Sequence, residues 1–443
     1  MSDKWRYMTA ADLGRGIADG DIDPVDLAET YLDAIAAHPD SGRIYARTTP
    51  DRARAEARAA SARMRAGQRR SALDGVPISW KDLYDTAGTL TEAGSGLLEG
   101  RVPDTDAEVL QNATSAGLVC LGKTHMTELA FSGLGLNPVT ATPPNINDPA
   151  VAPGGSSSGA ATSVAHGLAA AGIGSDTGGS VRIPSAWNNL VGLKTSVPRL
   201  SCKGVVPLCA SFDTVGPLCR SVADAALLLA ALEGGTPADL AGASLAGTRF
   251  LVLEGIATDE VEAPVAAGIS SAIERLQAAG ALVERHEIDA VREALSLAPM
   301  LFAPEAYGTW RDAIEAAPDR MHAAVRERFR GGGAVSASDH VAAWIRLRQL
   351  RDDYARATAG FDAVLLPASP IMPPNVAALN ADDDLFVRLN LLALRNTRIG
   401  NMMGLAVAVL PTGLPSVGLM MQVPELQENR LLRLAAAAEA ALA

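Results

Sequence analysis

The sequence predicts an α/β fold, because short apolar runs of strand length alternate with longer segments of helical pattern along most of the chain. The chain has 443 residues, of which 48% are hydrophobic, and this is enough for a large core around one sheet. No internal repeat, low-complexity linker or marked change of composition divides it. We therefore expect a single domain over residues 1–443.

The N-terminal part of the chain is expected to be helical. Asp23 and Pro24 are typical of a helix start, and large apolar residues then recur every four positions on one face. Residues 51–68 are rich in Ala, Arg and Glu but poor in large apolar side chains. This composition predicts an exposed surface helix whose charges only solvate it.

Several short apolar runs are expected to be buried strands, and one of them delivers Lys81 at its end. The runs are residues 76–80, 117–123, 250–253, 364–367, 405–410 and 417–421. The last two lie in a stretch without charge, but Pro411, Gly413 and Pro415 interrupt it. This interruption favours two strands joined by a turn over a membrane-spanning helix.

Two further segments are expected to be helical. Residues 160–171 are small and helical in character, so the Gly/Ser run at 154–159 would open a helix whose first backbone N–H groups are free. From about residue 257 to 360 the pattern is mostly helical, with a flexible interruption at 331–333. Such a helical insertion could cover an active site.

Charge and cysteine content exclude several classes of function. Lys and Arg number 38 against 50 Asp and Glu, and this net charge of -12 disfavours direct binding to nucleic acid or to anionic membranes. The four cysteines have neither the number of a disulfide framework nor the spacing of zinc ligands, so we expect reduced thiols and no metal. The first residues do not resemble a signal peptide, and the expected location is the cytoplasm.

The two segments that carry chemistry, residues 154–159 and 176–180, are rich in glycine and hydroxyl groups and contain no histidine. A serine nucleophile needs a base and donors for the oxyanion, and Ser180 follows two glycines in a turn suited to the second task. The expected oxyanion hole is formed by the backbone N–H groups of Thr177, Gly178, Gly179 and Ser180. Lys81 is the candidate base if burial keeps its amine neutral. A phosphate-binding loop or a flexible turn, with a solvated lysine, is the simpler alternative.

Residues 151–185 closely resemble the signature segment of the amidase signature family of serine amidohydrolases. The resemblance extends over most of the chain and is weakest at about residues 257–360. It also includes the segments 75–78 with Lys81 and Asp82, 122–128, 212–217 and 411–415. It implies a large, mixed, twisted β-sheet surrounded by helices on both faces.

The same resemblance assigns the catalytic residues. It implies that Ser180 is the nucleophile, that Ser156 bridges it to the base, and that Lys81 is the base. Ser156 would take the proton of Ser180 and pass its own proton to Lys81. It would later protonate the departing nitrogen, and an acyl-enzyme would remain at Ser180. The peptide bond between Gly155 and Ser156 is expected to be cis, and no cofactor is implied.

Neighbouring residues are expected to support this triad or to bind substrate. Asp176 and Arg182 would brace the nucleophile turn as an ion pair, and Ser157 would support it, with helix capping as the simpler role for its hydroxyl. Phe131 and Ser132 match the positions that line the acyl pocket in the family. Aromatic residues of the helical insertion could cap that pocket, although buried packing is the commoner role at their spacing. These aromatic residues are Phe302, Tyr307 and Trp310. The two histidines that could be considered as bases, His125 and His166, match no catalytic position of the family.

The expected function is hydrolysis of a carboxamide C–N bond in a small-molecule substrate, by a stand-alone amidase that acts on a small carboxamide or an aryl amide. The alternatives are the glutaminase subunit of a tRNA-dependent amidotransferase, a hydrolase of ureides similar to allophanate or biuret, and a noncatalytic scaffold. The intact set of Ser180, Ser156 and Lys81 disfavours the last. The assembly is left open, with a homodimer as one expectation.

Overall fold

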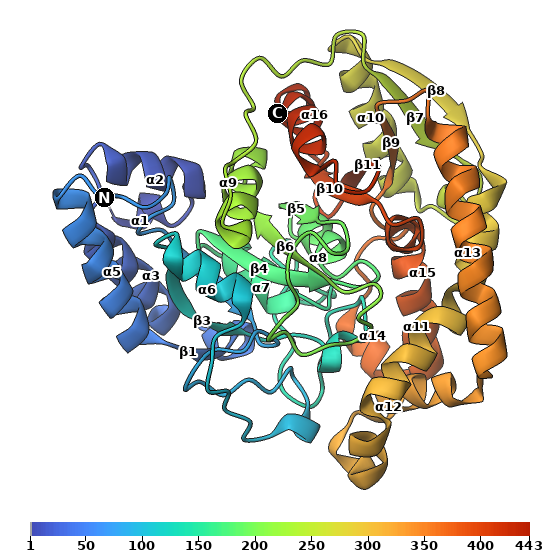
Figure 1. Cartoon of the computed structure of the whole chain (residues 1–443), viewed down its shortest axis with the longest axis horizontal. Helices are drawn as coiled ribbons and strands as arrows, with labels where there is room; N and C mark the ends of the chain where they lie inside the picture. The colour runs from blue at the N-terminus through green and yellow to red at the C-terminus, as the bar shows by residue number, and fades with distance from the viewer. Residues whose placement is uncertain (1) are drawn as a thin grey trace.

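The computed structural model describes residues 2–443, and its centre is an 11-stranded sheet (Figure 1). The strands are β1 (Tyr45–Thr48), β2 (Pro77–Lys81), β3 (Val119–Thr124), β4 (Ala171–Asp176), β5 (Val191–Lys194), β6 (Thr214–Cys219), β7 (Arg249–Leu253), β8 (Leu282–His286), β9 (Ala363–Pro367), β10 (Ala406–Pro411) and β11 (Gly418–Val423). Their order across the sheet is β1-β3-β2-β4-β6-β5-β10-β11-β9-β7-β8.

The sheet is mixed. Strand β2 runs parallel to both β3 and β4, and β7 runs parallel to both β8 and β9. The other neighbouring pairs are antiparallel, including the hairpin of β10 and β11. The α/β class predicted from the sequence is therefore confirmed, as is the large mixed sheet implied by the family resemblance.

Helices surround the sheet. The α-helices are α1 (Ser2–Trp5), α2 (Ala10–Ala18), α3 (Pro24–Ala37), α4 (Ser41–Ile44), α5 (Pro50–Arg65), α6 (Glu108–Ser115), α7 (Ser158–Ala165), α8 (Arg182–Trp187), α9 (Val222–Glu233), α10 (Ala263–Ala278), α11 (Asp289–Ala316), α12 (Ala323–Arg330), α13 (Ala337–Thr358), α14 (Val376–Ala381), α15 (Asp383–Met402) and α16 (Glu428–Leu442). Short 3-10 helices occur at η1 (Gly96–Leu98), η2 (Glu128–Ala130), η3 (Gly255–Ala257), η4 (Pro318–Arg320) and η5 (Gly331–Ala334).

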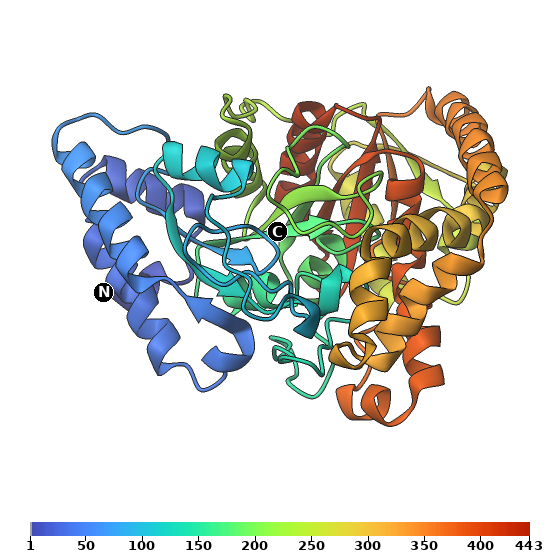
Figure 2. The same ribbon diagram turned by 60° about the horizontal axis from the view of Figure 1, so that its bottom comes forward.

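The molecule is elongated, with its N-terminal helices at one end and α11, α12 and α13 at the other. Figures 1 and 2 agree on this separation, since the blue helices and the gold to orange helices lie at opposite sides in both views. Between them, α7 contacts β4 and α8 contacts β5 and β10. These two helices follow the two serine-containing segments, so the candidate chemistry lies at the middle of the sheet.

Most predicted elements are present within a few residues of their expected bounds. Helix α3 begins at Pro24, and the carboxylate of Asp23 accepts a hydrogen bond from Val25 N–H as an N-cap. Strand β2 ends at Lys81, and the uncharged C-terminal stretch forms the hairpin of β10 and β11. Among the described residues, no helix is both long and apolar enough to cross a membrane.

The helix expected at residues 160–171 is shorter than predicted. Helix α7 ends at Ala165, and the chain turns at Gly167, whose φ of +67° lies in the left-handed region. Its last predicted residue, Ala171, instead begins β4, where it lies between β2 and β6. The burial of this segment inside the sheet outweighs the helical propensity of alanine.

The charges of α5 do more than solvate the helix. Its Ala53, Ala57 and Ala60 are buried, while Arg52 pairs with Asp106 and Arg63 pairs with Asp74 at 2.5 Å. The prediction of a merely solvated surface helix is therefore wrong. The arginines tie the helix to the loops beside β2 and β3.

The region expected to be a helical insertion is not helical throughout. It contains β8, an edge strand whose residues are largely exposed and which pairs in parallel with β7. An edge strand of this kind has few apolar residues, so it lacks the hydrophobic pattern by which a strand is recognised in a sequence. The expected flexible interruption at residues 331–333 is a 3-10 helix, Gly331–Ala334, because the glycines continue from the end of α12.

Candidate active site

The side chain of Lys81 is fully buried at the end of β2 and lies between hydroxyl groups. Its Nζ donates hydrogen bonds to Ser156 Oγ at 2.7 Å and to Ser175 Oγ at 2.8 Å. Strand β2 places it there because it is parallel to β4, which carries Ser175 next to its C-terminal end. The buried amine expected from the apolar run before Lys81 is therefore observed.

Burial favours the neutral form of this amine. Desolvation lowers the pKa of Lys81 to about 7, and the negative charges of Asp176 and Asp213 oppose the shift. A substantial fraction of the amine is therefore unprotonated at neutral pH, which is the form that can accept a proton.

Burial alone does not distinguish Lys81 from two other lysines of the sheet. Lys123 Nζ lies 3.3 Å from Asp82 Oδ1. Lys194 Nζ donates hydrogen bonds to the backbone carbonyls of Thr195 and Leu405. Desolvation lowers the pKa of Lys194 to about 7 as well. Of these three lysines in the described chain, only Lys81 contacts serine hydroxyls, so its partners rather than its pKa identify it as a candidate base.

Ser156 lies in the loop before α7 and follows a cis peptide bond at Gly155, as the family resemblance implies. Glycine is required before it, because a Cβ on Gly155 would lie 2.7 Å from Gly135 Cα and from Thr127 Oγ1. The carbonyl of Ser156 accepts a hydrogen bond from Thr127 N–H at 3.1 Å. These close contacts fix the loop that presents the Ser156 hydroxyl to Lys81.

Ser157 connects the two serine segments. Its N–H donates to the carbonyl of Ser180 at 3.2 Å, and its hydroxyl donates to the carbonyl of Ser175 at 3.2 Å. It occupies the N-cap position of α7 but makes no capping hydrogen bond. The capping role expected for its hydroxyl is therefore wrong, and the hydroxyl instead holds the loop against β4.

The turn between β4 and α8 presents Ser180 to a cavity. Gly179 has a φ of +142°, and a Cβ there would lie 2.2 Å from Thr397 Oγ1, so only glycine fits. Ser180 is 4% exposed and lines the cavity with Thr177 and Gly178. Among residues 2–443, no hydrogen bond joins the hydroxyls of Ser180 and Ser156, although Ser157 links their backbones.

A buried ion pair braces this turn. Arg182 donates to Asp176 through Nε at 2.9 Å and Nη2 at 2.8 Å, and Nη2 also donates to Asn401 Oδ1 at 2.6 Å. Burial opposes ionisation of Asp176, but the guanidinium outweighs it and lowers the pKa of the carboxyl well below its usual range. Asp176 also accepts from the N–H groups of Gly179 and Val181. The pair thus sets the shape of the turn, the supporting role expected from the sequence.

The backbone donors of the turn divide into two groups. The N–H of Gly179 donates to Asp176 Oδ1 at 2.9 Å and is already used. The N–H groups of Thr177, Gly178 and Ser180 have no protein acceptor among the described residues. Three of the four N–H groups expected in the oxyanion hole are therefore available to donate, and the oxyanion hole itself stays a prediction.

The cavity beside Ser180 is small, about 40 Å³, and its walls come from segments far apart in the sequence. Phe131 and Ser132 line it as expected, but the Ser132 hydroxyl donates to Asn390 Oδ1 at 3.0 Å. Phe302 of α11 also lines the cavity and stacks on Phe212 at 4.2 Å. Phe131 and Ser132 thus line a cavity next to the candidate nucleophile, and its use as an acyl pocket stays a prediction.

Other residues considered from the sequence lie outside this cavity. Trp310 donates through Nε1 to the carbonyl of Pro207, and Tyr307 donates to Glu315. Neither lines the cavity, and the same is true of His125 and His166. Desolvation lowers the pKa of His125 to about 4, so this imidazole is neutral at physiological pH.

Sequence reasoning missed four residues next to the site. Ser175 contacts Lys81, and it could have been noticed as a hydroxyl directly before the motif's Asp176. Asp213 accepts from Thr177 Oγ1 at 2.5 Å and thereby fixes the first residue of the turn. Arg328 and Arg398 line the cavity from α12 and α15, where no local pattern marks them.

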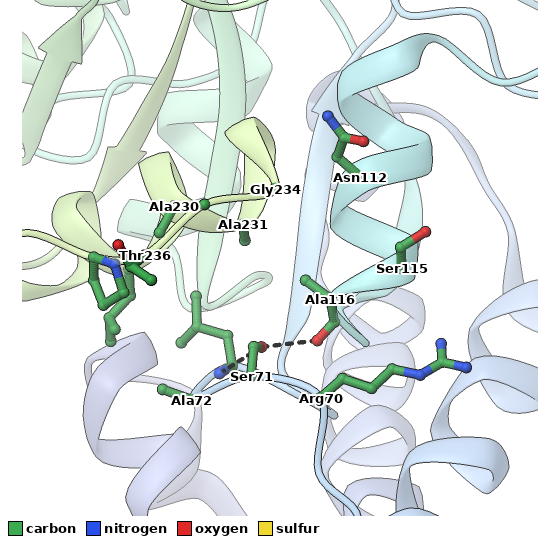
Figure 3. Close-up of a pocket in the computed structure, with 14 residues that line it drawn as sticks. Arg70, Ser71, Ala72, Asn112, Ser115, Ala116, Ala230, Ala231, Gly234 and Thr236 are labelled. Atoms are coloured by element: carbon green, nitrogen blue, oxygen red, sulfur yellow. Dashed lines mark hydrogen bonds between the residues drawn. The ribbon is translucent and has the colours of Figure 1, made fainter.

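Three larger cavities, of about 410, 510 and 600 Å³, lie elsewhere, and none of the three is lined by Lys81, Ser156 or Ser180. The one in Figure 3 has a volume of about 410 Å³ and lies between α6, α9 and the loop after α5. Ser71 donates there to the carbonyl of Ala116 at 2.7 Å, and Arg70 is its one charged lining residue. Within residues 2–443, no cluster of His, Cys, Asp and Glu side chains could hold a metal ion.

Sequence comparison places this chain close to characterised proteins. A family model described as Amidase matches residues 26–432. The 2-amino-5-chloromuconic acid deaminase of Comamonas testosteroni is 34% identical over 400 residues, which cover 88% of this chain and 86% of that protein. The glutamyl-tRNA(Gln) amidotransferase of Anaeromyxobacter sp. (strain K) contains an A-type subunit that is 33% identical and aligns over 92% of both chains.

Solved structures agree with these matches. A crystal structure of an amidase superimposes with a TM-score of 0.89 and 29% identity, over 98% of this chain and 100% of that one. The peptide amidase of Stenotrophomonas maltophilia superimposes with a TM-score of 0.81 and 27% identity, over 98% of this chain and 96% of that one.

Proposed function

The chain belongs to the amidase family and is an amidohydrolase, and from this premise we propose that it hydrolyses a linear carboxamide through Ser180, Ser156 and Lys81. The products would be a carboxylic acid and ammonia or an amine. The observation that carries the proposal is the buried Lys81 Nζ, 2.7 Å from Ser156 Oγ, in the loop that is hydrogen-bonded to Ser180.

The proposed reaction begins with proton transfer away from Ser180. Neutral Lys81 accepts the proton of Ser156 while Ser156 accepts that of Ser180, and Ser180 Oγ attacks the carbonyl carbon. The Ser180 hydroxyl turns toward Ser156 in the substrate complex, since catalytic hydrogen bonds are often long in the free enzyme. The second hydroxyl on Lys81, that of Ser175, holds the amine in place during the transfer.

The tetrahedral intermediate then collapses. Its oxyanion receives hydrogen bonds from the N–H groups of Thr177, Gly178 and Ser180, which have no other acceptor among the described residues. The C–N bond breaks as Ser156 protonates the nitrogen and regains a proton from the Lys81 ammonium. Water attacks the acyl-enzyme by the same relay and releases the acid.

Substitution of the proposed nucleophile and base tests this assignment. We expect Ser180→Ala and Lys81→Ala each to lower kcat by about 10³-fold or more, because the residues of a relay act as a unit. A panel of amides, ureides and esters should be assayed with the purified chain, and labelling by a fluorophosphonate should disappear in Ser180→Ala. Near-normal turnover by Lys81→Ala at pH 7 would refute the base assignment.

A second candidate is the glutaminase component of a tRNA-dependent amidotransferase, because a component of such an enzyme aligns over 92% of this chain. Glutaminase activity that requires an added partner protein would support it. Hydrolysis of simple amides by the pure chain would support the stand-alone enzyme.

A third candidate substrate class comes from the deaminase relative, whose name states that it acts on an acid. Release of ammonia from an amino-substituted unsaturated acid should therefore be included in the panel.

We also propose a small-molecule substrate and a cytoplasmic location, in keeping with four free cysteines. Assembly as a homodimer stays a prediction, which light scattering of the purified chain tests.

A further inference from the structure

Two arginines line the cavity beside the candidate nucleophile. Arg328 comes from α12 and Arg398 from α15, and both share this cavity with Ser180. Arg398 lies against the nucleophile turn, since a Cβ on Gly178 would be 3.7 Å from its Cγ and 3.9 Å from its Nε. The positive charges therefore lie within one small pocket and close to the reacting atoms.

Neither guanidinium has an acidic partner within residues 2–443. Arg328 donates to the carbonyl of Phe131 at 2.5 Å, and its Cζ lies 4.3 Å from the centre of the Phe131 ring. It forms no ion pair with residues 2–443. Arg398 makes neither an ion pair nor a side-chain hydrogen bond to protein in the described chain. In contrast, the buried Arg182 is fully engaged by Asp176, Asn401 and Thr397.

Two guanidinium groups in one pocket repel each other when no negatively charged ligand lies between them. Burial, followed by the positive charge of Arg398, lowers the pKa of Arg328 to about 9, and burial lowers the pKa of Arg398 to about 10. Both remain charged at neutral pH. A carboxylate is the group that would restore balance, because the planar fork of arginine binds it with two parallel hydrogen bonds.

We propose that Arg328 and Arg398 bind a free carboxylate on the acyl part of the substrate, so that the enzyme prefers monoamides of short dicarboxylic acids. This inference rests on the proposed function. The carboxylate lies against the two guanidinium groups while the amide carbonyl lies at Ser180. The small cavity, about 40 Å³, favours a short chain between the two ends.

The same pocket disfavours an amino acid amide such as glutamine. No Asp or Glu is among the described residues that line it, so a substrate ammonium has no counter-charge there. The nearby carboxyl of Asp213 already accepts hydrogen bonds from Thr177, Leu208 and Cys209. The ammonium would instead lie beside two arginines and be repelled.

A comparison of charged and neutral substrates tests the inference. We expect kcat/KM for succinamate or glutaramate to exceed kcat/KM for butyramide. Arg328→Gln or Arg398→Gln should lower this preference, the kcat/KM of the charged substrate divided by that of butyramide, about 10- to 100-fold. Arg388→Gln, an exposed arginine on the same helix as Arg398, is the matched control and should keep the ratio. Efficient hydrolysis of butyramide with no gain for succinamate would overturn the inference and leave the proposed function standing.

A binding experiment separates this inference from the chemistry. Succinate and glutarate should bind to Ser180→Ala in calorimetry, and the added Arg398→Gln change should weaken binding about 10-fold or more. Absence of dicarboxylate binding would overturn the inference even if amides are hydrolysed. An equal loss of kcat on succinamate and butyramide in Arg398→Gln would also overturn it, because it would place that arginine at the oxyanion.

Discussion

At the scale of single residues, the environment of an amine decides its chemistry. Lys81 and Lys194 are both fully buried, and desolvation lowers the pKa of each to about 7. Lys194 faces two backbone carbonyls, which can only accept hydrogen bonds, so it has no proton to receive. Lys81 faces two hydroxyls, which can donate, and this difference makes it the candidate base.

The pH dependence of the reaction should follow the protonation of Lys81. Below its pKa of about 7 the amine is an ammonium that cannot accept a proton, so kcat/KM should fall about tenfold per pH unit. Above pH 7 the amine is neutral and the rate should level off. Initial rates at constant ionic strength from pH 5 to 9 measure this, and a flat profile would contradict the assignment.

Two neighbouring serines provide a matched pair of variants. Ser156→Ala removes the hydroxyl that contacts Lys81, and we expect kcat to fall about 10³-fold or more. Ser158→Ala removes a buried hydroxyl that has no hydrogen-bond partner among the described residues, so activity should stay within about threefold. Steady-state kinetics of both variants decide the point, and equal losses would argue against a specific role for Ser156.

The two glycines of the nucleophile turn should respond differently to a methyl group. Gly179→Ala places a Cβ 2.2 Å from Thr397 Oγ1 at a φ of +142°, and we expect a loss of about 1–3 kcal/mol of stability. Gly178→Ala meets nothing closer than 3.7 Å and should be tolerated by the fold. Thermal unfolding of both variants checks the difference, and equal melting temperatures would show that the turn is not tightly held.

At the scale of elements, the site depends on contacts between β4, α8 and α15. Asp176 ends β4, Arg182 begins α8, and Thr397 and Asn401 lie on α15. Arg182 Nη1 donates to the carbonyl of Thr397 at 2.5 Å, and Thr397 Oγ1 donates to the carbonyl of Gly178 at 2.7 Å. The distant helix α15 thus holds the nucleophile turn from outside the signature segment.

Loss of this brace should destabilise the protein. Arg182→Met leaves the Asp176 carboxylate buried without its counter-charge, and we expect a loss of about 3–5 kcal/mol in the free energy of unfolding. Arg388→Met, which changes an exposed arginine of α15, should change that free energy by less than about 0.5 kcal/mol. Urea denaturation measures both, and similar stabilities would mean that the ion pair is dispensable.

A structural element or site residue could be predicted from the sequence where a pattern of a few neighbouring residues encodes it. The Gly/Ser turns, the strand that ends at Lys81 and the hairpin of β10 and β11 are encoded within a few residues, and each is observed. The edge strand β8 is not, because an exposed edge lacks the alternating apolar pattern of a buried strand. Arg328 and Arg398 were missed because only tertiary packing brings α12 and α15 to the cavity.

At the scale of the whole molecule, the sheet gathers groups from distant parts of the chain. Strands β2 and β4 are neighbours although 90 residues separate Lys81 from Ala171, and the cavity adds side chains from α11, α12 and α15. The N-terminal helices and α11 to α13 extend the two ends of the molecule (Figure 2). The candidate site therefore draws on residues from Lys81 to Asn401, and no short segment of the chain contains it.

Removal of metal ions should leave the activity unchanged. The proposed reaction uses an amine and hydroxyls, and no cluster of at least three His, Cys, Asp or Glu side chains within residues 2–443 is arranged to bind a metal. Dialysis against EDTA, followed by an assay with and without added zinc or magnesium, checks this. Loss of activity that either metal restores would contradict the proposed chemistry.

The burial of lysines in the sheet has a practical consequence for chemical modification. The sequence contains five lysines, and three of them, Lys81, Lys123 and Lys194, are enclosed in the core. Lys4 and Lys203 are exposed. Among the lysines, succinimidyl esters will therefore attach a dye or a solid support to these two positions, and the acylated protein will retain an unmodified Lys81 amine next to Ser156 and Ser175.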